Sequence, residues 1–261
     1  MTSATPTASG GNTIFTMTPA ANLASNTTYK IRVTTGVKDA SANALAAQFT
    51  TATGFTTLYS RTITIDGTND FNVTENELST SNTGKVYVSY DATNVYVGMT
   101  HGDILGSGTG SGNKFIYVIF NSDATLATGN ANSSDSKAKF GTTSKKMQYH
   151  WKERVDGANF TEFQSAPAGT WAAWTSSGST NRASGYVEAS IPRTSFGSPS
   201  KLQITFYLVD YNGGSGNGWL YNMLNGATEG AAATPVDLVK YVEIDFAASA
   251  NPNAAGNIKS F

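Results

Sequence analysis

KVYVSYDATNVYVGMTHGD, residues 85–103, carries the strongest strand pattern in the chain. In its first half Val86, Val88 and Tyr90 alternate with tyrosine and serine, and a second alternating segment follows the turn-forming residues 91–94. Alternation with period two on both sides of a short polar loop predicts an antiparallel β-hairpin. We expect one face of this hairpin to lie in a core and its tyrosines to lie on the other face.

The rest of the chain contains further segments of this kind. Segments 114–120 and 202–209 are nearly continuous apolar runs, which are typical of central strands buried on both faces. No run of ten or more residues shows convincing helical periodicity. We therefore predict an all-β fold, with an antiparallel, jelly-roll-like β-sandwich in the larger part of the chain. Other strands are expected at 62–67, 147–151, 160–163, 185–191 and 239–246.

Charge and composition exclude several classes of function. The chain has 17 basic and 18 acidic residues, a net charge of −1 and no basic stripe, which argues against a nucleic-acid partner. No apolar stretch approaches the roughly 20 residues that span a bilayer, so we expect no transmembrane segment. The absence of cysteine excludes disulfides and thiolate chemistry. Abundant Gly, Ser, Thr and Asn, with 13% charged residues, favour a secreted protein or one on the bacterial cell surface.

Three segments near the N-terminus follow one another in a specific order. They are TPAANLASNTTYKIRV at 18–33, GVKDASANALA at 36–46 and FTT at 49–51. Together they resemble the C-terminal half of a bacterial Ig-like surface domain. The resemblance implies a partial Ig-like β segment at 1–53, followed by a linker at 54–61.

The first strands of that family have no counterpart in the partial segment. Half a sandwich leaves an unpaired sheet edge and an uncovered apolar face, which are unstable alone. Three explanations remain open: a truncated sequence, strands supplied from elsewhere in the chain, or strands donated by a neighbouring subunit.

A second series of motifs runs through the larger part of the chain. It begins with IDG at 65–67, continues through the hairpin at 85–103, and includes GYVEASIP at 185–192. With the motifs in this order, residues 62–250 resemble the family 9 carbohydrate-binding module and the wider group of DOMON-like sandwiches. The resemblance implies a non-catalytic β-sandwich that binds sugar, with residues 251–261 left as a C-terminal tail. Some members of the group bind haem.

Tryptophans and polar residues in the long loops are candidates for a sugar site. Such a site places an aromatic plane against the apolar face of the sugar ring, with amides, acids or hydroxyls on the sugar hydroxyls. Trp219 lies in the glycine-rich loop 211–235, and Trp174 lies near a strand end. In the resembled family, aromatics from such loops sandwich the sugar; the alternative is that each tryptophan is a core residue or a loop anchor. The candidate hydrogen-bonding residues are Asn217, Asp210 and Gln148.

Aspartates near strand ends suggest a structural calcium ion. Ca²⁺ takes about six to eight oxygen ligands, and sandwiches of the resembled group frequently hold one. Asp66 and Asp103 are the candidate ligands; the alternative is that they cap turns. Haem would need a Met–His pair such as Met147 with His150 or Met99 with His150, but Met99 already fits the alternation of the hairpin core. We therefore expect no haem.

The sequence contains no recognisable catalytic motif. It lacks G-x-S-x-G, H-E-x-x-H and a P-loop, so we expect a protein that is not an enzyme. The first hypothesis is a glycan-binding or adhesion module whose partner is a polysaccharide or surface glycan. The alternative is a structural subunit of a surface layer or filament. Such a subunit would self-associate through sheet edges, with a neighbour donating a β-strand to the partial Ig-like segment.

Overall fold

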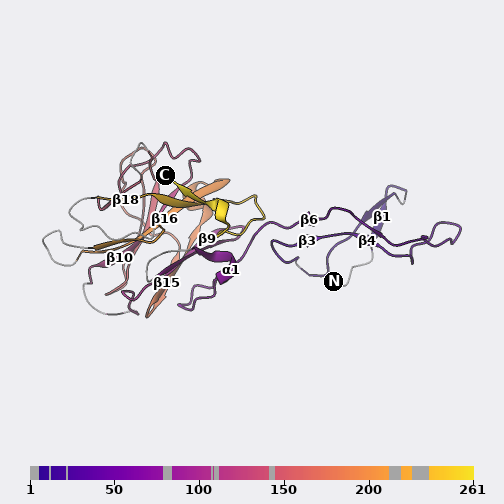
Figure 1. Cartoon of the computed structure of the whole chain (residues 1–261), viewed down its shortest axis with the longest axis horizontal. Helices are drawn as coiled ribbons and strands as arrows, with labels where there is room; N and C mark the ends of the chain where they lie inside the picture. The colour runs from indigo at the N-terminus through magenta and orange to yellow at the C-terminus, as the bar shows by residue number, and fades with distance from the viewer. Residues whose placement is uncertain are drawn as a thin grey trace. The chain divides into compact units, whose positions relative to one another are not determined.

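The computed structural model divides the chain into two compact units, Met1–Tyr59 and Ser60–Phe261 (Figure 1). We call the first the N-terminal unit and the second the sandwich unit. The residues that the structure describes are 6–11, 13–21, 23–78, 84–106, 108, 112–140, 145–211, 219–224 and 235–261.

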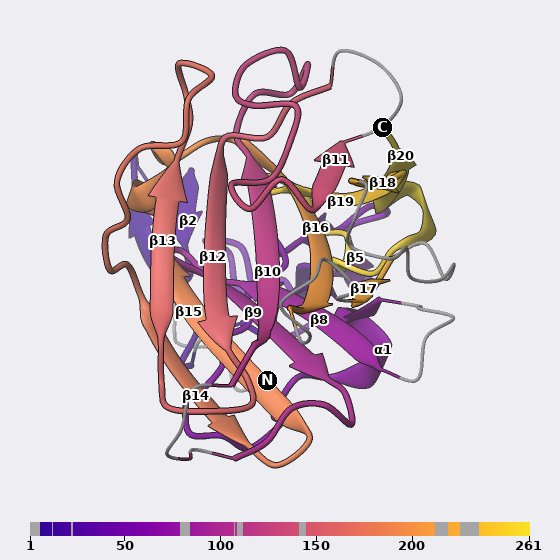
Figure 2. The same ribbon diagram turned by 90° about the vertical axis from the view of Figure 1, so that its left-hand side faces the viewer.

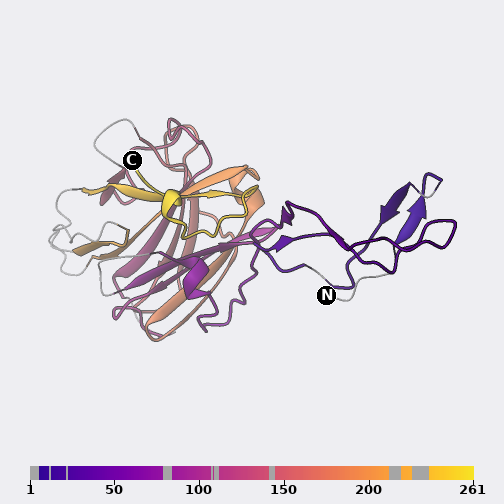
Figure 3. The same cartoon turned by 45° about the vertical axis from the view of Figure 1, so that its right-hand side comes forward.

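Short antiparallel pairs make up the N-terminal unit; the hairpin of its first two strands is drawn in indigo in Figure 3. The pairs are β1 (Thr7–Ser9) with β2 (Ile14–Thr16), β3 (Thr28–Tyr29) with β6 (Phe55–Thr56), and β4 (Arg32–Val33) with β5 (Phe49–Thr50). The loop between β4 and β5 is shaped by Asp39, whose carboxylate accepts hydrogen bonds from the N–H groups of Ser41 and Asn43, both at 2.9 Å. The Asn43 side-chain amide donates to the same carboxylate at 3.0 Å, which explains the aspartate and asparagine of the GVKDASANALA motif.

Apolar side chains of the N-terminal unit lie largely at its surface. Phe15 is 64% exposed, Ile14 57% and Phe49 56%. Strands of two or three residues, against a usual length of about five or six, bury little apolar area. The described part of this unit therefore has the open edges and uncovered apolar side chains expected of a partial Ig-like segment.

Two antiparallel sheets form the sandwich unit. The strands of the larger sheet are β10 (Lys114–Asn121), β12 (Tyr149–Arg154), β13 (Thr161–Ser165), β16 (Lys201–Asp210), β17 (Trp219–Asn222), β19 (Lys240–Asp245) and β20 (Ile258–Ser260). Those of the smaller sheet are β7 (Glu77–Leu78), β8 (Lys85–Tyr90), β9 (Asn94–Thr100), β14 (Ser179–Ala183) and β15 (Tyr186–Pro192).

The seven-stranded sheet has the order β13-β12-β10-β16-β19-β20, with β17 also paired to β16, and the five-stranded sheet has the order β14-β15-β9-β8-β7. Figure 2 shows β13, β12 and β10 side by side, crossing in front of β15. A separate parallel pair is made by β11 (Ala138–Phe140) and β18 (Val236–Leu238). The sole α-helix of the described chain is α1 (Val73–Asn76). The all-β prediction is confirmed.

The central strands are buried on both faces, as their continuous apolar sequences predict. Every residue of Phe115–Asn121 on β10 and of Leu202–Val209 on β16 is buried. Strand β10 pairs with β16 along its whole length, from Lys114 opposite Asp210 to Asn121 opposite Gln203. They form the centre of the seven-stranded sheet.

The hairpin at 85–103 forms as β8 and β9, but its tyrosine face differs from the expectation. Tyr87 and Tyr96 are buried rather than solvated. They pack with Tyr186, Ile63 and Phe71 in a small core, because the segment before α1 lies over this face. The strand predicted at 62–67 does not form. This segment, which contains the IDG motif, covers the sheet in an extended conformation instead.

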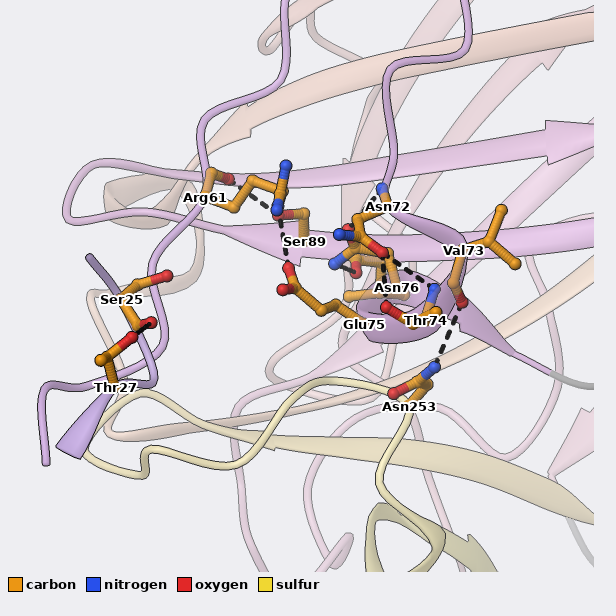
Figure 4. A network of polar contacts seen from close by, with 11 residues as sticks. Ser25, Thr27, Arg61, Asn72, Val73, Thr74, Glu75, Asn76, Ser89 and Asn253 are labelled. Carbon is orange, nitrogen blue, oxygen red and sulfur yellow. Dashed lines mark hydrogen bonds and ion pairs between the residues drawn. The ribbon is translucent and has the colours of Figure 1, made fainter.

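The C-terminal residues 251–261 are not a tail in the structure. Strand β20 pairs antiparallel with β19, from Lys240 opposite Ser260 to Val242 opposite Ile258. Upstream, Asn253 donates its backbone N–H to Glu75 O at 3.2 Å and its amide to Val73 O at 3.5 Å, so the segment is also tied to α1 (Figure 4). Sequence periodicity missed β20 because a three-residue strand is too short to show alternation.

Within the described chain, the helices are too short and too polar to cross a bilayer.

Candidate functional site

The two faces of the seven-stranded sheet have different surroundings. Along β10, Phe120 points toward the five-stranded sheet, where its ring centroid lies 4.8 Å from that of Phe196 in the turn after β15. Tyr117 points the opposite way because side chains alternate along a strand, and it packs in a cluster that includes Phe140 of β11 and Leu238 of β18. We call this second side the outer face.

Polar and aromatic side chains concentrate on the outer face. The pairing register places Tyr117 opposite both Lys152 on β12 and Tyr207 on β16, and places Lys152 opposite Glu162 on β13. Adjacent strands thus align these side chains in one row across the sheet. We define the outer-face cluster as Tyr117, Asp135, His150, Lys152, Glu162, Tyr207 and Tyr211.

Three tyrosines and one aspartate form one half of the cluster. The rings of Tyr117 and Tyr207 are stacked, with centroids 4.6 Å apart and an interplanar angle of 7°. The hydroxyl oxygens of Tyr117 and Tyr211 are 3.0 Å apart, and Asp135 accepts hydrogen bonds from Tyr207 at 3.0 Å and from Tyr211. Burial raises the pKa of all three tyrosines above its ordinary value. Their hydroxyls therefore remain protonated donors at any physiological pH.

His150 forms the other half, with Glu162. Its Nε2 lies 3.0 Å from Glu162 Oε1 and its Nδ1 lies 3.1 Å from Ser134 Oγ. Burial lowers the pKa of His150, which is fully buried. The neutral imidazole therefore donates its Nε2–H to the carboxylate and accepts at Nδ1 from the serine hydroxyl.

The row Ser134, His150, Glu162 has the order of a nucleophile, a base and an orienting acid. The imidazole, however, has no exposed surface at which a substrate group could meet it. The contacts of His150 reach the loop before β11. The ring centroid of Trp171 lies 5.1 Å from that of His150, and Trp171 donates its Nε1–H to Asn132 O in this loop at 3.0 Å. We therefore interpret Ser134, His150 and Glu162 as residues that hold this loop against the sheet.

The border of the outer-face cluster is accessible. Lys152 and Tyr211 are partly exposed, as are the neighbouring Phe160, Arg154 and Trp171. Rings and charged groups therefore reach solvent beside the buried hydrogen-bond network, which is the mixture of surfaces that small polar ligands use.

Of the residues expected to bind sugar, two lie together at one end of β16. Asp210 is the cross-strand partner of Trp219 on β17. Lys114 lies on the other side of Asp210, with its Nζ 3.8 Å from Asp210 and 2.5 Å from Asp103. Asn217 lies outside the described residues.

Gln148 and Trp174 lie apart from that pair. Gln148 is buried, accepts from Ser122 N–H at 3.0 Å and donates to Thr128 Oγ1 at 2.7 Å. Its backbone N–H binds Phe120 O, so it lies at the end of β10 opposite to Lys114, about 20 Å away at 3.3 Å per residue. Trp174, in the connection from β13 to β14, is 62% exposed.

The two candidate calcium ligands have different partners. Asp66 accepts from Thr68 N–H at 2.8 Å, the bond of a turn cap, and its own N–H donates to Glu188 Oε1 at 2.7 Å. Gly67 donates to the same oxygen at 2.6 Å, so the glutamate of GYVEASIP anchors the IDG turn. Asp103 is ion-paired with Lys114. The described residues include no group of three or more His, Cys, Asp or Glu side chains arranged to hold a metal, and calcium at Asp66 and Asp103 stays a prediction.

Sequence reasoning missed most of the outer-face cluster. Tyr117 and Tyr207 read as members of apolar strands, and Asp135 lies in a polar loop without a motif. The signal that could have indicated the cluster is the occurrence of polar groups at facing positions of neighbouring strands. Recognising facing positions requires the strand register, which the sequence alone does not give. Two further members, His150 and Glu162, meet diagonally across β12 and β13, whose register places Glu162 opposite Lys152.

Comparison with known proteins bears on the N-terminal unit. Residues 1–57 match the model of the bacterial Ig-like domain. This agrees with the Ig-like resemblance of the TPAANLASNTTYKIRV and GVKDASANALA segments. No curated protein and no solved structure matches the chain. The likeness of residues 62–250 to carbohydrate-binding modules therefore rests on the motifs and stays a prediction.

Proposed function

We propose that the chain is a non-catalytic protein of the bacterial surface whose sandwich unit binds a saccharide at the outer-face cluster. The observation that carries this proposal is the combination of partly exposed aromatic rings with a row of polar groups on one sheet face. Trp171 and Tyr211 offer ring surface, while Asp135 and Lys152 offer an acceptor and a donor at the border. The match of residues 1–57 to the bacterial Ig-like domain supports a surface or adhesion role.

Saccharide binding needs a ring platform and directed hydrogen bonds, and both are preorganised here. The buried bonds of the tyrosine hydroxyls and of the imidazole hold the sheet face and the loop that carry the accessible border groups, which limits the entropy lost on binding. An aromatic ring against a pyranose supplies apolar contact area, and the border groups supply specificity. Trp174 and Trp219, with Asn217, Asp210 and Gln148, remain alternative platforms and partners from the sequence prediction.

The test is a glycan array probed with the whole chain, followed by calorimetry on any saccharide that binds. We expect Trp171→Ala to weaken binding about tenfold, the equivalent of about 1.4 kcal/mol, because it removes a ring beside His150. Trp174→Ala is the matched control, since Trp174 lies exposed in the same connection. If only Trp174→Ala loses binding, the binding site lies at Trp174 and not at Trp171. If no saccharide on the array binds, the proposed function is refuted.

A second candidate function rests on the N-terminal unit. We propose that this unit assembles with another β-strand, because Phe15, Ile14 and Phe49 expose more than half of their surface on strands with open edges. Light scattering at micromolar concentration tests it, with Phe15→Lys as the disrupting variant. Large assemblies that Phe15→Lys dissolves would support a structural subunit, whereas a monomer at all concentrations would refute it.

A further inference from the structure

Two cations lie side by side over aromatic rings at one border of the outer-face cluster. Lys152 Nζ lies 4.6 Å from the ring centroid of Phe115 and 5.4 Å from that of Phe160. The guanidinium carbon of Arg154 lies 5.3 Å and 5.4 Å from the same two centroids. Both side chains leave β12 on the outer face, two residues apart, so the same pair of rings positions both charges.

Neither cation has a counterion in the described part of the chain. The ion pairs found there, with a limit of 4.0 Å, involve neither Lys152 nor Arg154. The Nε of Arg154 is buried and has no hydrogen-bond partner. The two like charges repel one another, with no carboxylate within ion-pair distance of either in the described residues, and a buried donor left unpaired is unfavourable.

Burial is the main influence on the Lys152 ammonium and lowers its pKa. The charges of Glu162 and Asp135 raise the pKa, and the charge of Arg154 has a smaller, lowering effect. An anionic group seated between the two cations would offset their repulsion and stabilise the partly buried charge of Lys152.

We infer that Lys152 and Arg154 form a subsite for the carboxylate of an acidic saccharide, such as a uronic acid. The guanidinium has the planar donor pair that suits a carboxylate, and Phe160 beside it offers a ring to the apolar side of the sugar. This inference rests on the proposed saccharide binding and specifies its ligand class. It also predicts selectivity against neutral sugars, because binding one would desolvate the two cations without pairing them with an anion.

Calorimetry with a galacturonic acid trisaccharide and with its methyl ester tests the inference. The two probes have the same ring and differ in charge. We expect the acid to bind at least about tenfold more tightly than the ester, because a charge-assisted hydrogen bond typically exceeds the equivalent of one decade in affinity. Lys152→Met and Arg154→Met should each remove this preference, since methionine keeps the ring contact and loses the charge.

Lys259→Met is the matched control. It changes the net charge equally on the same sheet, but Lys259 is on β20 and is paired with Glu243 at 2.7 Å. The preference for the acid should survive in this variant. Equal binding of acid and ester by the wild type would overturn the inference and leave saccharide binding intact.

A second measurement distinguishes failure of the anion subsite from failure of the proposed saccharide binding. Sodium sulfate is titrated while the pKa of the Lys152 ammonium is followed by NMR, and we expect the pKa to rise as the anion binds. A rise without any saccharide binding would support the anion subsite and refute the proposed function. No rise, with no preference between acid and ester, would overturn the subsite.

Discussion

Asp91 holds the turn of the central hairpin with one carboxylate. It accepts hydrogen bonds from Thr93 N–H at 2.8 Å, Asn94 N–H at 2.9 Å and the Tyr96 hydroxyl at 2.6 Å. Burial alone would raise the pKa of Asp91, but these bonds lower it from 3.8 to about 2. Burial, together with the hydrogen bond to Asp91, raises the pKa of Tyr96 to about 12. A turn predicted from its residue types is thus fixed by a specific acceptor.

The variant Asp91→Asn should lose stability in a pH-dependent way. At pH 5 we expect the free energy of unfolding to fall by about 1 to 2 kcal/mol, since the amide cannot accept all of these bonds. Because the folded-state pKa lies below the unfolded one, the wild-type advantage is present above about pH 4 and is lost as the pH falls toward about 2. Urea unfolding at several pH values measures it; a difference that stays constant down to pH 2 would contradict the assignment.

Glu153 behaves in the opposite sense. It is buried, and burial raises the pKa of its carboxyl from 4.5 to about 7, against the lowering effect of a hydrogen bond from Thr161. The folded state therefore holds a proton that the unfolded state releases at lower pH, and stability declines as the pH rises from about 4.5 to about 7. We expect Glu153→Gln to be more stable than the wild type at pH 8, by about 2 kcal/mol.

Glu243→Gln is the control for this prediction. Burial would raise the pKa of Glu243, but hydrogen bonds from Lys259, Gln203 and Lys201 lower it overall. This variant should be less stable than the wild type at pH 8. Thermal unfolding of both variants at pH 4 and pH 8 distinguishes the two signs, and a stabilised Glu243→Gln would show that charge removal alone explains the effect.

Among the elements, those with long alternating or apolar sequences were predictable. The hairpin of β8 and β9 and the central strands β10 and β16 follow from periodicity, because each buries apolar side chains at regular positions. Strands β14 and β20 were missed, since STNRA has no apolar alternation and IKS is too short. The pair of β11 and β18 joins residues about a hundred positions apart, which local patterns do not encode.

The candidate site was less predictable than the fold, because it too depends on contacts between residues that are distant in the sequence. Trp174 and Trp219 were chosen by residue type and loop position, whereas the outer-face cluster is defined by cross-strand register. A shift of register by one residue would place Tyr117 and Lys152 on the opposite face. Residue type indicates which chemistry is available, and pairing decides which groups meet.

The edge hairpin of β14 and β15 depends on one glycine. Gly178 has φ of +83°, and a Cβ there would lie 2.0 Å from Ser190 O. We expect Gly178→Ala to destabilise the chain by more than about 2 kcal/mol, because both backbone strain and a clash oppose it. Gly185, at the other end of β14 with φ of +80°, has nothing within 4 Å of such a Cβ.

The variant Gly185→Ala therefore separates strain from clash. It should cost about 1 kcal/mol, the strain of a left-handed residue alone. Urea unfolding of the two variants gives the comparison. Equal losses would show that the contact with Ser190 relaxes without cost.

At the scale of the whole molecule, the two units differ in how they are stabilised. The sandwich unit has two sheets with buried strands, while the N-terminal unit has short pairs with exposed apolar side chains. Local opening is easiest where few apolar contacts are buried. Stability should therefore be distributed unevenly along the chain.

Limited proteolysis of the dilute whole chain should remove residues within 1–59 first and leave a fragment close to 60–261. Mass spectrometry over time identifies the products. Raising the protein concentration before proteolysis is the companion measurement, since assembly through the N-terminal unit would protect it. Early cleavage in the seven-stranded sheet would contradict this order.

The bonds from Asp66 and Gly67 to Glu188 also bear on the order in which the chain is made. Glu188 lies 122 residues beyond Asp66, so a ribosome completes the β8–β9 hairpin long before the glutamate leaves the exit tunnel. Until then the IDG segment lacks its anchor, and the tyrosine face of a finished hairpin stays uncovered in the nascent chain. Long-range closure of this kind slows folding and exposes apolar surface to neighbours. The nascent chain is therefore most prone to association between completion of the hairpin and emergence of Glu188.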